Sequence, residues 1–150
     1  MLVQFTIENH RSIKNSAVIS FAASKDKSLE EYLLHPDEKK TLLPAIAIYG
    51  ANAAGKSNVL HAMRTMREMV VGDAAKALKG QKLPWEPFGG NTEPTSFEIV
   101  FIYQGVRYAY GFPLMKRKYI RNIFIIGLNG REALIFSRDN GVYEFREKCQ

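Results

Sequence analysis

The chain is almost free of cysteine: its 150 residues include only Cys149. This scarcity excludes a disulfide framework and any zinc site built from several cysteines, and it favours a reducing compartment. Long hydrophobic runs are lacking too, because none approaches the ~18 residues that a membrane-spanning helix needs. Charged residues occur as early as Glu8 and Arg11, which excludes a secretion signal at the N-terminus. We therefore expect a cytoplasmic protein without a membrane partner.

The composition is that of an ordinary globular domain. Apolar residues make up 46% of the chain and charged residues 24%, which excludes a disordered tail, a collagen-like chain and a coiled coil. The length predicts one domain. Lysine and arginine total 21 against 15 acidic residues, and the resulting net charge of +6 permits phosphate or nucleic-acid partners without requiring either.

Hydrophobic periodicity predicts strands and a loop in the first third of the chain. Apolar and polar residues alternate over residues 3–7 and again over 17–21, which predicts a β-hairpin. Residues 24–40 are polar and charged and predict a loop with one helical turn. An unbroken apolar run at 45–49 predicts a strand buried on both faces of a parallel or mixed sheet.

A helix and a set of hairpins are expected after this run. The helix has apolar residues spaced by four, three and four positions: Val59, Met63, Met66 and Val70. Residues 73–79 predict a second short helix ended by Gly80. Three prolines and three glycines in residues 80–96 are too many for a regular element, so we expect a link at 81–96. Beyond it, the period of two predicts strands at 97–103 and 106–114 around Gln104 and Gly105, at 120–128 and 133–138 around Asn129 and Gly130, and at 142–145.

The residues that carry chemistry lie between the expected strand and helix. Residues 50–57 read Gly-Ala-Asn-Ala-Ala-Gly-Lys-Ser, which fits the phosphate-binding P-loop G-x-x-x-x-G-K-[ST]. Successive backbone N–H groups and the positive end of the helix dipole form a nest for oxyanions there, and Gly50 and Gly55 let the backbone curl where a Cβ would obstruct it. Lys56 supplies charge to the β- and γ-phosphates, and the Ser57 hydroxyl is placed to coordinate Mg²⁺. We expect ATP and Mg²⁺ as cofactors and Lys56 as the catalytic residue; a glycine-rich turn with an exposed Lys-Ser pair is the alternative.

Two segments carry a resemblance to a known family. Residues 50–58, Gly-Ala-Asn-Ala-Ala-Gly-Lys-Ser-Asn, resemble the P-loop of the RecF and SMC branch of ABC-type ATPases, where asparagine is usual at the third position and after the serine. Residues 5–13, Phe-Thr-Ile-Glu-Asn-His-Arg-Ser-Ile, resemble the N-terminal strand of that branch. The segments 94–99 and 107–112 are similar to the β-rich arm of the bacterial AAA_15/AAA_21 group, which includes RloA-like and OLD-like ATPases often linked to phage defence.

The resemblance implies a fold class and a division of the chain. The fold would be α/β, the N-terminal lobe of a P-loop NTPase with a mixed sheet and a P-loop helix, plus an antiparallel β-hairpin arm. Residues 1–80 would form the nucleotide-binding lobe and 97–150 the arm of the same ATPase head. Such an ATPase also needs a Q-loop, a signature motif and a Walker B strand. We find neither of the last two here and expect a C-terminal half beyond Gln150; Gln104 favours a hairpin turn over a Q-loop.

The resemblance also implies site residues. The nucleotide would contact a continuous set: Gly50, Ala51, Asn52, Ala53, Ala54, Gly55, Lys56, Ser57 and Asn58. Arg11 would lie near it, with a solvated hairpin arginine as the other interpretation. Ala53 stands where the wider branch commonly has glycine, so alanine costs about 1 kcal/mol if φ is positive there. His10 stands where the pattern has phenylalanine, and we expect it to keep a flat ring packed.

The implied function is that of an ATPase head. ATP would bind this lobe and be hydrolysed when two heads of a homodimer close, and the cycle would control a nuclease or other effector in phage defence or DNA repair. The chain alone is expected to bind ATP without efficient hydrolysis. A non-catalytic nucleotide-binding or interaction module and a small P-loop kinase stay open, as does the choice between ATP and GTP.

Other residues allow a functional and a plain interpretation. The densest basic cluster predicts either a DNA contact or a solvated loop: Lys116, Arg117, Lys118 and Arg121. His35 and His61 have no histidine, cysteine or acidic partner at ligand spacing, so we expect no metal at either. Trp85 either stacks on a base or, as we favour, packs.

Overall fold

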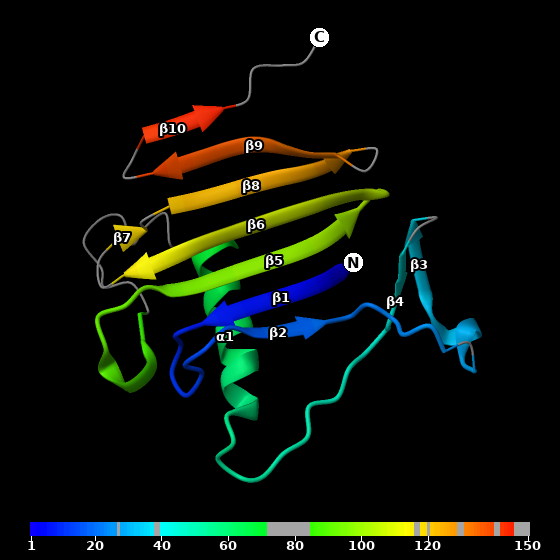
Figure 1. Ribbon diagram of the computed structural model, residues 1–150, viewed down its shortest axis with the longest axis horizontal. Coiled ribbons are helices and arrows are strands. Elements are labelled where there is room, and N and C mark those ends of the chain that lie inside the picture. The colour runs from blue at the N-terminus through cyan, green and yellow to red at the C-terminus, as the bar shows by residue number, and fades with distance from the viewer. Residues whose placement is uncertain are drawn as a thin grey trace.

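An antiparallel sheet is the main element of the fold, and its strands come from both ends of the chain (Figure 1). The computed structural model describes residues 1–26, 28–37, 40–71, 85–115, 118–119, 121–128, 131–139 and 142–145. Eight described strands form the sheet in the order β10-β9-β8-β6-β5-β1-β2, with β7 beside β6. Their bounds are β1 Leu2–Glu8, β2 Ala17–Ser20, β5 Thr95–Tyr103, β6 Val106–Met115, β7 Lys118–Tyr119, β8 Arg121–Leu128, β9 Arg131–Asp139 and β10 Val142–Phe145.

The hairpins expected from the alternating pattern are confirmed. β1 pairs with β2, and Phe5 lies opposite Ile19. β5 and β6 are joined through Gln104 and Gly105, whose φ values are 49° and 74°. Two positive φ values are what a two-residue hairpin turn of type I′ requires, so Gln104 lies in a hairpin turn, as predicted from the sequence. β8–β9 and β9–β10 are also antiparallel pairs.

The expected loop at 24–40 is wrong in part, because it contains strands. The expected helical turn is present as η1 (Glu30–Tyr32), but β3 (Leu34–Asp37) and β4 (Lys40–Leu42) form a separate two-stranded sheet. Leu42 is 1% exposed and packs with Val3, Val100 and Ile102 of the large sheet. This tertiary burial, which the local sequence does not reveal, outweighs the polar composition.

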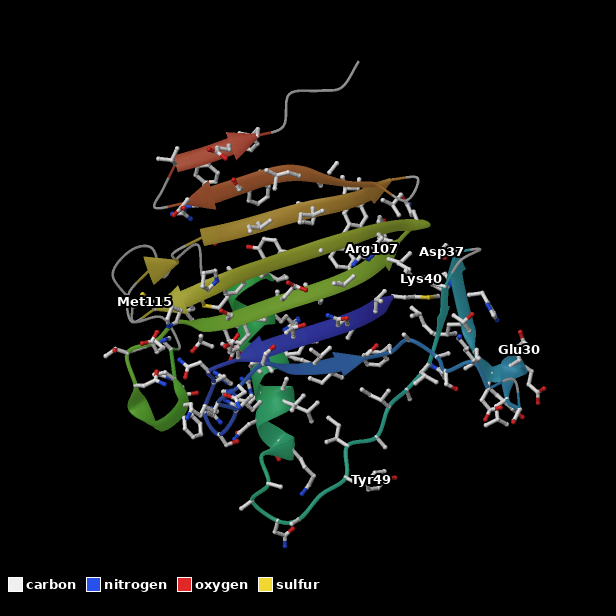
Figure 2. All side chains as sticks on the ribbon, in the orientation of Figure 1. Glu30, Asp37, Lys40, Tyr49, Arg107 and Met115 are labelled. Atoms are coloured by element: carbon white, nitrogen blue, oxygen red, sulfur yellow. The ribbon has the colours of Figure 1, made fainter. Side chains whose placement is uncertain are left out.

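The expected buried strand at 45–49 is also wrong. These residues form no strand, and Tyr49 is 90% exposed on the extended segment that Figure 2 shows leading away from the sheet. A strand forms only where neighbours accept its backbone hydrogen bonds, and no described strand pairs with this run. The described strand pairs are all antiparallel, where a mixed sheet was expected.

The expected P-loop helix is present as α1 (Lys56–Val71). Its buried residues are Ala62, Thr65, Met66 and Met69. Of the four residues of the predicted stripe only Met66 is among them, and Val70 is 50% exposed. The helix therefore faces the sheet through a stripe that is rotated from the predicted one, and it packs on Phe5, Ile7, Phe97 and Phe112.

A β-bulge gives β1 a role on both faces of the sheet. The register with β5 shifts between Leu2 and Gln4, and such a shift interrupts the alternation of side chains. Phe5 and Ile7 belong to the core beneath α1, whereas Val3 belongs to the core beneath β4. One strand thus holds both hydrophobic cores together.

The predicted division of the chain stays a prediction, but strands from both sides of the expected link share one sheet. β1 pairs with β5 from Leu2 opposite Phe101 to Glu8 opposite Ser96. Within the expected link, residues 85–96 are described and include η2 (Phe88–Gly90). The expected helix at 73–79, Gly80, and the turn residues Asn129 and Gly130 lie outside the described residues.

Asn9 forms hydrogen bonds that join the end of β1 to the segment before β5, residues 88–93. Its side chain is 5% exposed, and its Nδ2 donates to the Glu93 carbonyl at 2.8 Å and to Asn91 Oδ1 at 3.0 Å. Its Oδ1 accepts hydrogen bonds from Asn91 Nδ2 at 2.9 Å and from the Phe88 backbone N–H at 3.2 Å. The φ of Asn9 is 52°, a left-handed value that asparagine tolerates better than most residues.

We predict that Asn9→Ala destabilises the chain by about 2–4 kcal/mol. The substitution leaves buried polar partners unpaired, which costs about 1–3 kcal/mol, and adds a left-handed alanine at about 1 kcal/mol. Asn9→Gly keeps the backbone conformation and isolates the hydrogen bonds. Urea unfolding measures both, with exposed Asn15→Ala as the control expected to change stability by less than about 0.5 kcal/mol. A loss below 1 kcal/mol for Asn9→Ala would contradict this role.

Candidate nucleotide-binding site

The P-loop forms an exposed turn that leads into α1. Gly50 and Gly55 have φ values of 159° and 88°, and at Gly55 the backbone is in a region that favours glycine. Ala53 has φ 62°, so the condition set above for a strained alanine is met. The loop residues 51–54 are exposed, which leaves their backbone accessible to a ligand.

Lys56 folds back over this loop. Its Nζ donates to the backbone carbonyl oxygen of Gly50 at 2.8 Å and to that of Ala51 at 2.6 Å. The ammonium is thereby held near the first helical residue, where unpaired N–H groups and the helix dipole attract anions. Ser57, the expected Mg²⁺ ligand, lies beside it on the first turn and is exposed.

The turn after β1 contacts the P-loop through Ser12. A Cβ added at Gly55 would lie 2.6 Å from the Ser12 Oγ, so only glycine fits there without a shift. The same Oγ accepts a hydrogen bond from Asn58 Nδ2 at 2.7 Å. Asn58 was expected to contact nucleotide; here its amide ties the helix start to Ser12. The two segments that carried the resemblance therefore meet in space.

Arg11 is engaged by a residue that sequence reasoning missed. Its Nε donates to Glu86 Oε2 at 2.6 Å and its Nη2 to Oε1 at 3.2 Å, while its backbone N–H bonds the Glu86 carbonyl at 2.8 Å. The hydrogen bond from Arg11 lowers the pKa of the Glu86 carboxyl. Arg11 is thus an ion-paired residue next to Ser12 rather than a freely solvated one, and its contact with nucleotide stays a prediction. No local motif marks Glu86, because its partner precedes it by 75 residues.

Of the remaining predictions, those for His10 and Trp85 are confirmed, and the one for the basic cluster stays a prediction. His10 keeps a buried ring against Phe97, with centroids 5.6 Å apart, as expected. Trp85 packs against the core beneath α1. In the basic cluster, Lys116 and Arg117 lie outside the described residues and the side chains of Lys118 and Arg121 are not described, so a DNA contact stays a prediction.

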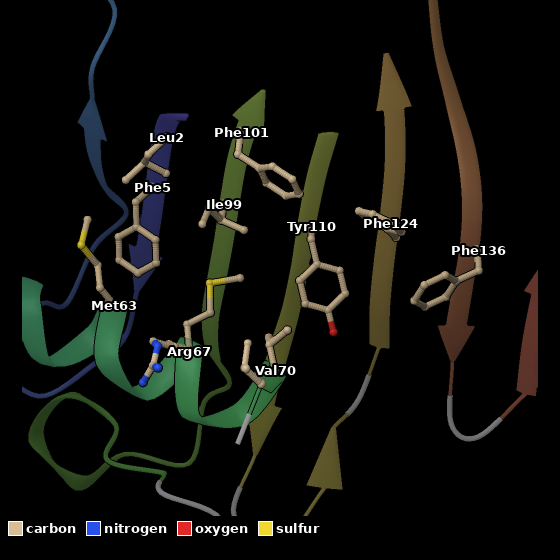
Figure 3. A pocket seen from close by; sticks show the side chains of 12 residues that line it. Leu2, Phe5, Met63, Arg67, Val70, Ile99, Phe101, Tyr110, Phe124 and Phe136 are labelled. Atoms are coloured by element: carbon tan, nitrogen blue, oxygen red, sulfur yellow. The ribbon is translucent and has the colours of Figure 1, made fainter. Parts of the chain in front are cut away.

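An apolar cavity lies beside the second half of α1, away from the P-loop. Its volume is about 590 Å³, and Figure 3 shows Phe101, Tyr110 and Phe124 of the sheet facing Met63 and Val70 of the helix across it. Among the described residues that line it nearly all are apolar, and Arg67 is the one charged residue. Such a lining offers few of the polar groups that fix a phosphate, so this cavity is a poor candidate for the nucleotide site.

A glycine-rich loop that opens an amphipathic helix, with its lysine held over the helix start, is that of a P-loop nucleotide-binding domain of the ATPase type. The chain belongs to the AAA_21 family, described as "AAA domain, putative AbiEii toxin, Type IV TA system", whose pattern matches residues 45–147. A comparison with curated proteins returned no match. Among the described helices, none has the length and apolar character required to cross a membrane.

The strained alanine in the loop generates a prediction. Ala53→Gly relieves a left-handed backbone that costs alanine about 1–2 kcal/mol, offset by about 0.4–1 kcal/mol of added freedom in the unfolded chain. We expect a net gain of up to about 1.6 kcal/mol in the free energy of unfolding, measured in urea. Ala54→Gly is the matched control: the φ of Ala54 is not positive, so the same change there is expected to destabilise by about 0.5–1 kcal/mol. Equal effects at the two positions would contradict the assignment of strain.

Proposed function

We propose that this chain is the ATP- and Mg²⁺-binding part of an ABC-type ATPase, whose head dimerises to hydrolyse ATP and thereby controls an effector in phage defence or another DNA-related process. The observation that carries the proposal is the position of Lys56. Its ammonium donates hydrogen bonds to the carbonyl oxygens of Gly50 and Ala51. These residues belong to an exposed turn that ends at Gly55, whose φ is 88°. A polyphosphate is the ligand that this combination suits.

The loop residues would divide the work of binding. Backbone N–H groups of residues 51–57 would receive the β-phosphate, since no side chain larger than asparagine obstructs the loop before Lys56. Lys56 would exchange the carbonyls of Gly50 and Ala51 for phosphate oxygens, which gives it a stronger, oppositely charged partner. Ser57 offers one hydroxyl, and Mg²⁺ suits such a site because it keeps several waters and takes its other ligands from the phosphates. When bound, the ion neutralises the charge that develops during phosphoryl transfer.

Efficient hydrolysis needs groups beyond this loop. An acidic pair after a buried strand and a signature motif are not found in the 150 residues, so a second head and further elements would have to supply them. We therefore propose binding by this chain and turnover by the complete dimer. The family description names a toxin of a toxin–antitoxin system, which supports an effector-control role over a small-molecule kinase.

Lys56→Ala tests the binding step. At an Mg-ATP concentration of 100 times Kd, binding stabilises the wild-type chain by about 2.7 kcal/mol, and we expect the variant to lose most of this gain. Differential scanning calorimetry with and without Mg-ATP measures it, and exposed Lys14→Ala serves as the charge-matched control that should keep the full gain. An unchanged wild-type melting temperature at millimolar Mg-ATP would favour the non-binding module, and transfer of phosphate to an acceptor other than water would favour the kinase.

Ser57→Ala distinguishes the contribution of the Mg²⁺ ligand to ATP affinity from that of the backbone N–H groups that bind phosphate. Without the hydroxyl, we expect ATP affinity in EDTA to stay within about twofold of wild type, whereas the gain on adding Mg²⁺ falls by about tenfold, equivalent to about 1.4 kcal/mol. Titration calorimetry with ATP in Mg²⁺ and in EDTA gives both values. If Ser57→Ala and wild type gain equally from Mg²⁺, the hydroxyl is no ligand. Phosphate release by the wild-type chain at a rate near 1 s⁻¹ or above, lost in Lys56→Ala, would contradict the need for a second head.

A further inference from the structure

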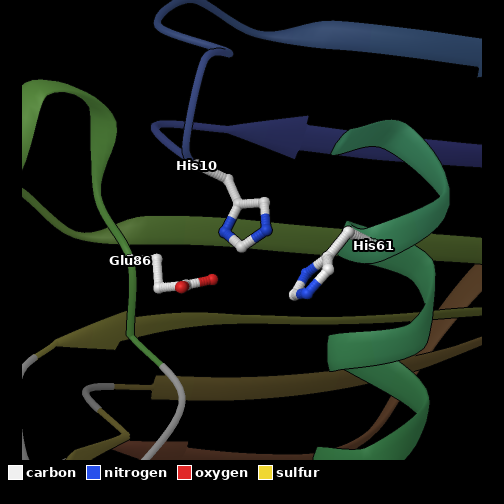
Figure 4. Close-up of side chains that lie close together, drawn as sticks. All are labelled: His10, His61 and Glu86. Carbon is white, nitrogen blue, oxygen red and sulfur yellow. The ribbon is translucent and has the colours of Figure 1, made fainter. Parts of the chain in front are cut away.

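Three side chains able to bind metal converge beside α1. They are His10 after β1, His61 on α1, and Glu86 in the segment before η2. One ligand atom from each lies within 4.8 Å of the other two, and Figure 4 shows the Glu86 carboxylate directed toward the two imidazole rings. No metal was expected at His61, because its histidine and acidic partners do not lie at ligand spacing in the sequence. The fold brings together residues that lie far apart in the chain.

His10 is the member that packing alone explains least. His10 is 0% exposed, and neither its Nδ1 nor its Nε2 has a hydrogen-bond partner among the described residues. Buried polar atoms without partners are costly, and here two ring nitrogens that could bind a metal are buried next to the hydrophobic core. The ring lies 5.9 Å from that of His61, centroid to centroid, at an interplanar angle of 30°.

We propose that His10, His61 and Glu86 bind a divalent transition-metal ion, with Zn²⁺ as the best match. Two imidazoles and one carboxylate form a recognised zinc ligand set that leaves a fourth position for water. Nitrogen ligands favour zinc and its neighbours over Mg²⁺, so this site is chemically distinct from the one at Ser57. Tetrahedral zinc with bonds near 2.1 Å places its ligand atoms ~3.4 Å apart, so atoms that lie within 4.8 Å of one another need to close by at most about 1.4 Å.

Neighbouring residues already orient the ligands. Thr65 Oγ1 lies 3.4 Å from His61 Nδ1, which leaves the other ring nitrogen of His61 for a metal. Arg11 holds both oxygens of Glu86, at 2.6 and 3.2 Å, and each carboxylate oxygen keeps a lone pair for a second partner. Such outer partners fix the direction of ligating side chains.

The bound ion would join three segments that meet at the P-loop. His10 is two residues from Ser12, which packs on Gly55, and His61 lies on the helix that begins at Lys56. Zinc would therefore stabilise the packing of α1 against the turn after β1 and the segment at Glu86, without contacting the nucleotide. Its binding is expected to be independent of Lys56.

Titration calorimetry of the metal-free, untagged chain with ZnCl₂ tests the proposal. Every protein carries Cys149→Ser, which removes the only thiol. We expect one zinc ion per chain, an affinity at least ~10-fold weaker in His10→Phe, and an unchanged affinity in the exposed control His35→Phe and in Lys56→Ala. His10→Phe keeps an aromatic ring in the core and should fold. Equal zinc affinity in wild type and His10→Phe would overturn the proposal.

Co²⁺ gives a second readout that a purely structural change would not move. A four-coordinate site with nitrogen ligands gives intense visible absorption bands, which we expect in wild type, altered in Glu86→Gln and absent in His10→Phe. Should His10→Phe fail to fold, Glu86→Gln decides: a Co²⁺ spectrum identical to that of wild type would overturn the assignment of Glu86 as a ligand. Failure of Mg-ATP binding with zinc binding intact would contradict the proposed function alone.

Discussion

The short turn after β1 is the constraint on which the rest of the structure depends. Its residues bind three different partners. Asn9 binds the segment before β5, Arg11 binds Glu86, and Ser12 binds Asn58 at the start of α1. Two of these residues, Asn9 and Arg11, have positive φ, at 52° and 51°. Non-glycine residues hold such values only where the surroundings compensate for the strain, and here the buried amide and the ion pair do so. Without this turn, the P-loop would have no rigid support on the side of β1.

The sheet supports the helix whose N-terminal end is the proposed phosphate site. α1 buries Ala62, Met66 and Met69 against phenylalanines of β1, β5 and β6, whereas in its first turn Ser57 is exposed at the loop. A helix held along its length but open at its N-terminus keeps its dipole directed at a ligand without rearrangement. The β-bulge in β1 completes the arrangement, since it lets one strand join the core under α1 to the core under β4.

The sequence predicts local features well and long-range ones poorly, and particular residues show why. The hairpin at Gln104 and Gly105 and the helix after Gly55 follow from period and turn chemistry, which act over a few residues. The run at 45–49 was expected to be a strand, but a strand depends on partners that the period does not specify, and Tyr49 is exposed instead. Glu86 and the neighbours of His61 were missed for the same reason, because their contacts join distant segments. The strain at Ala53 could be anticipated, since the loop motif itself sets the backbone there.

The pairing of β1 with β5 also sets an order for folding during synthesis. Leu2 lies opposite Phe101, so β1, which can pair early with β2, cannot pair with β5 until residues around 95–103 have been made. At about 5–20 residues per second, Phe5 and Ile7 wait on the order of 5–20 s for the strand that buries them. When residues 50–71 have been made, the P-loop and α1 still lack the complete sheet on which the helix packs. Until β5 pairs with β1, the hairpin of β1 and β2 presents an unpaired strand edge to other chains. The proposed nucleotide site can therefore be complete only after β5 has been made and has paired with β1.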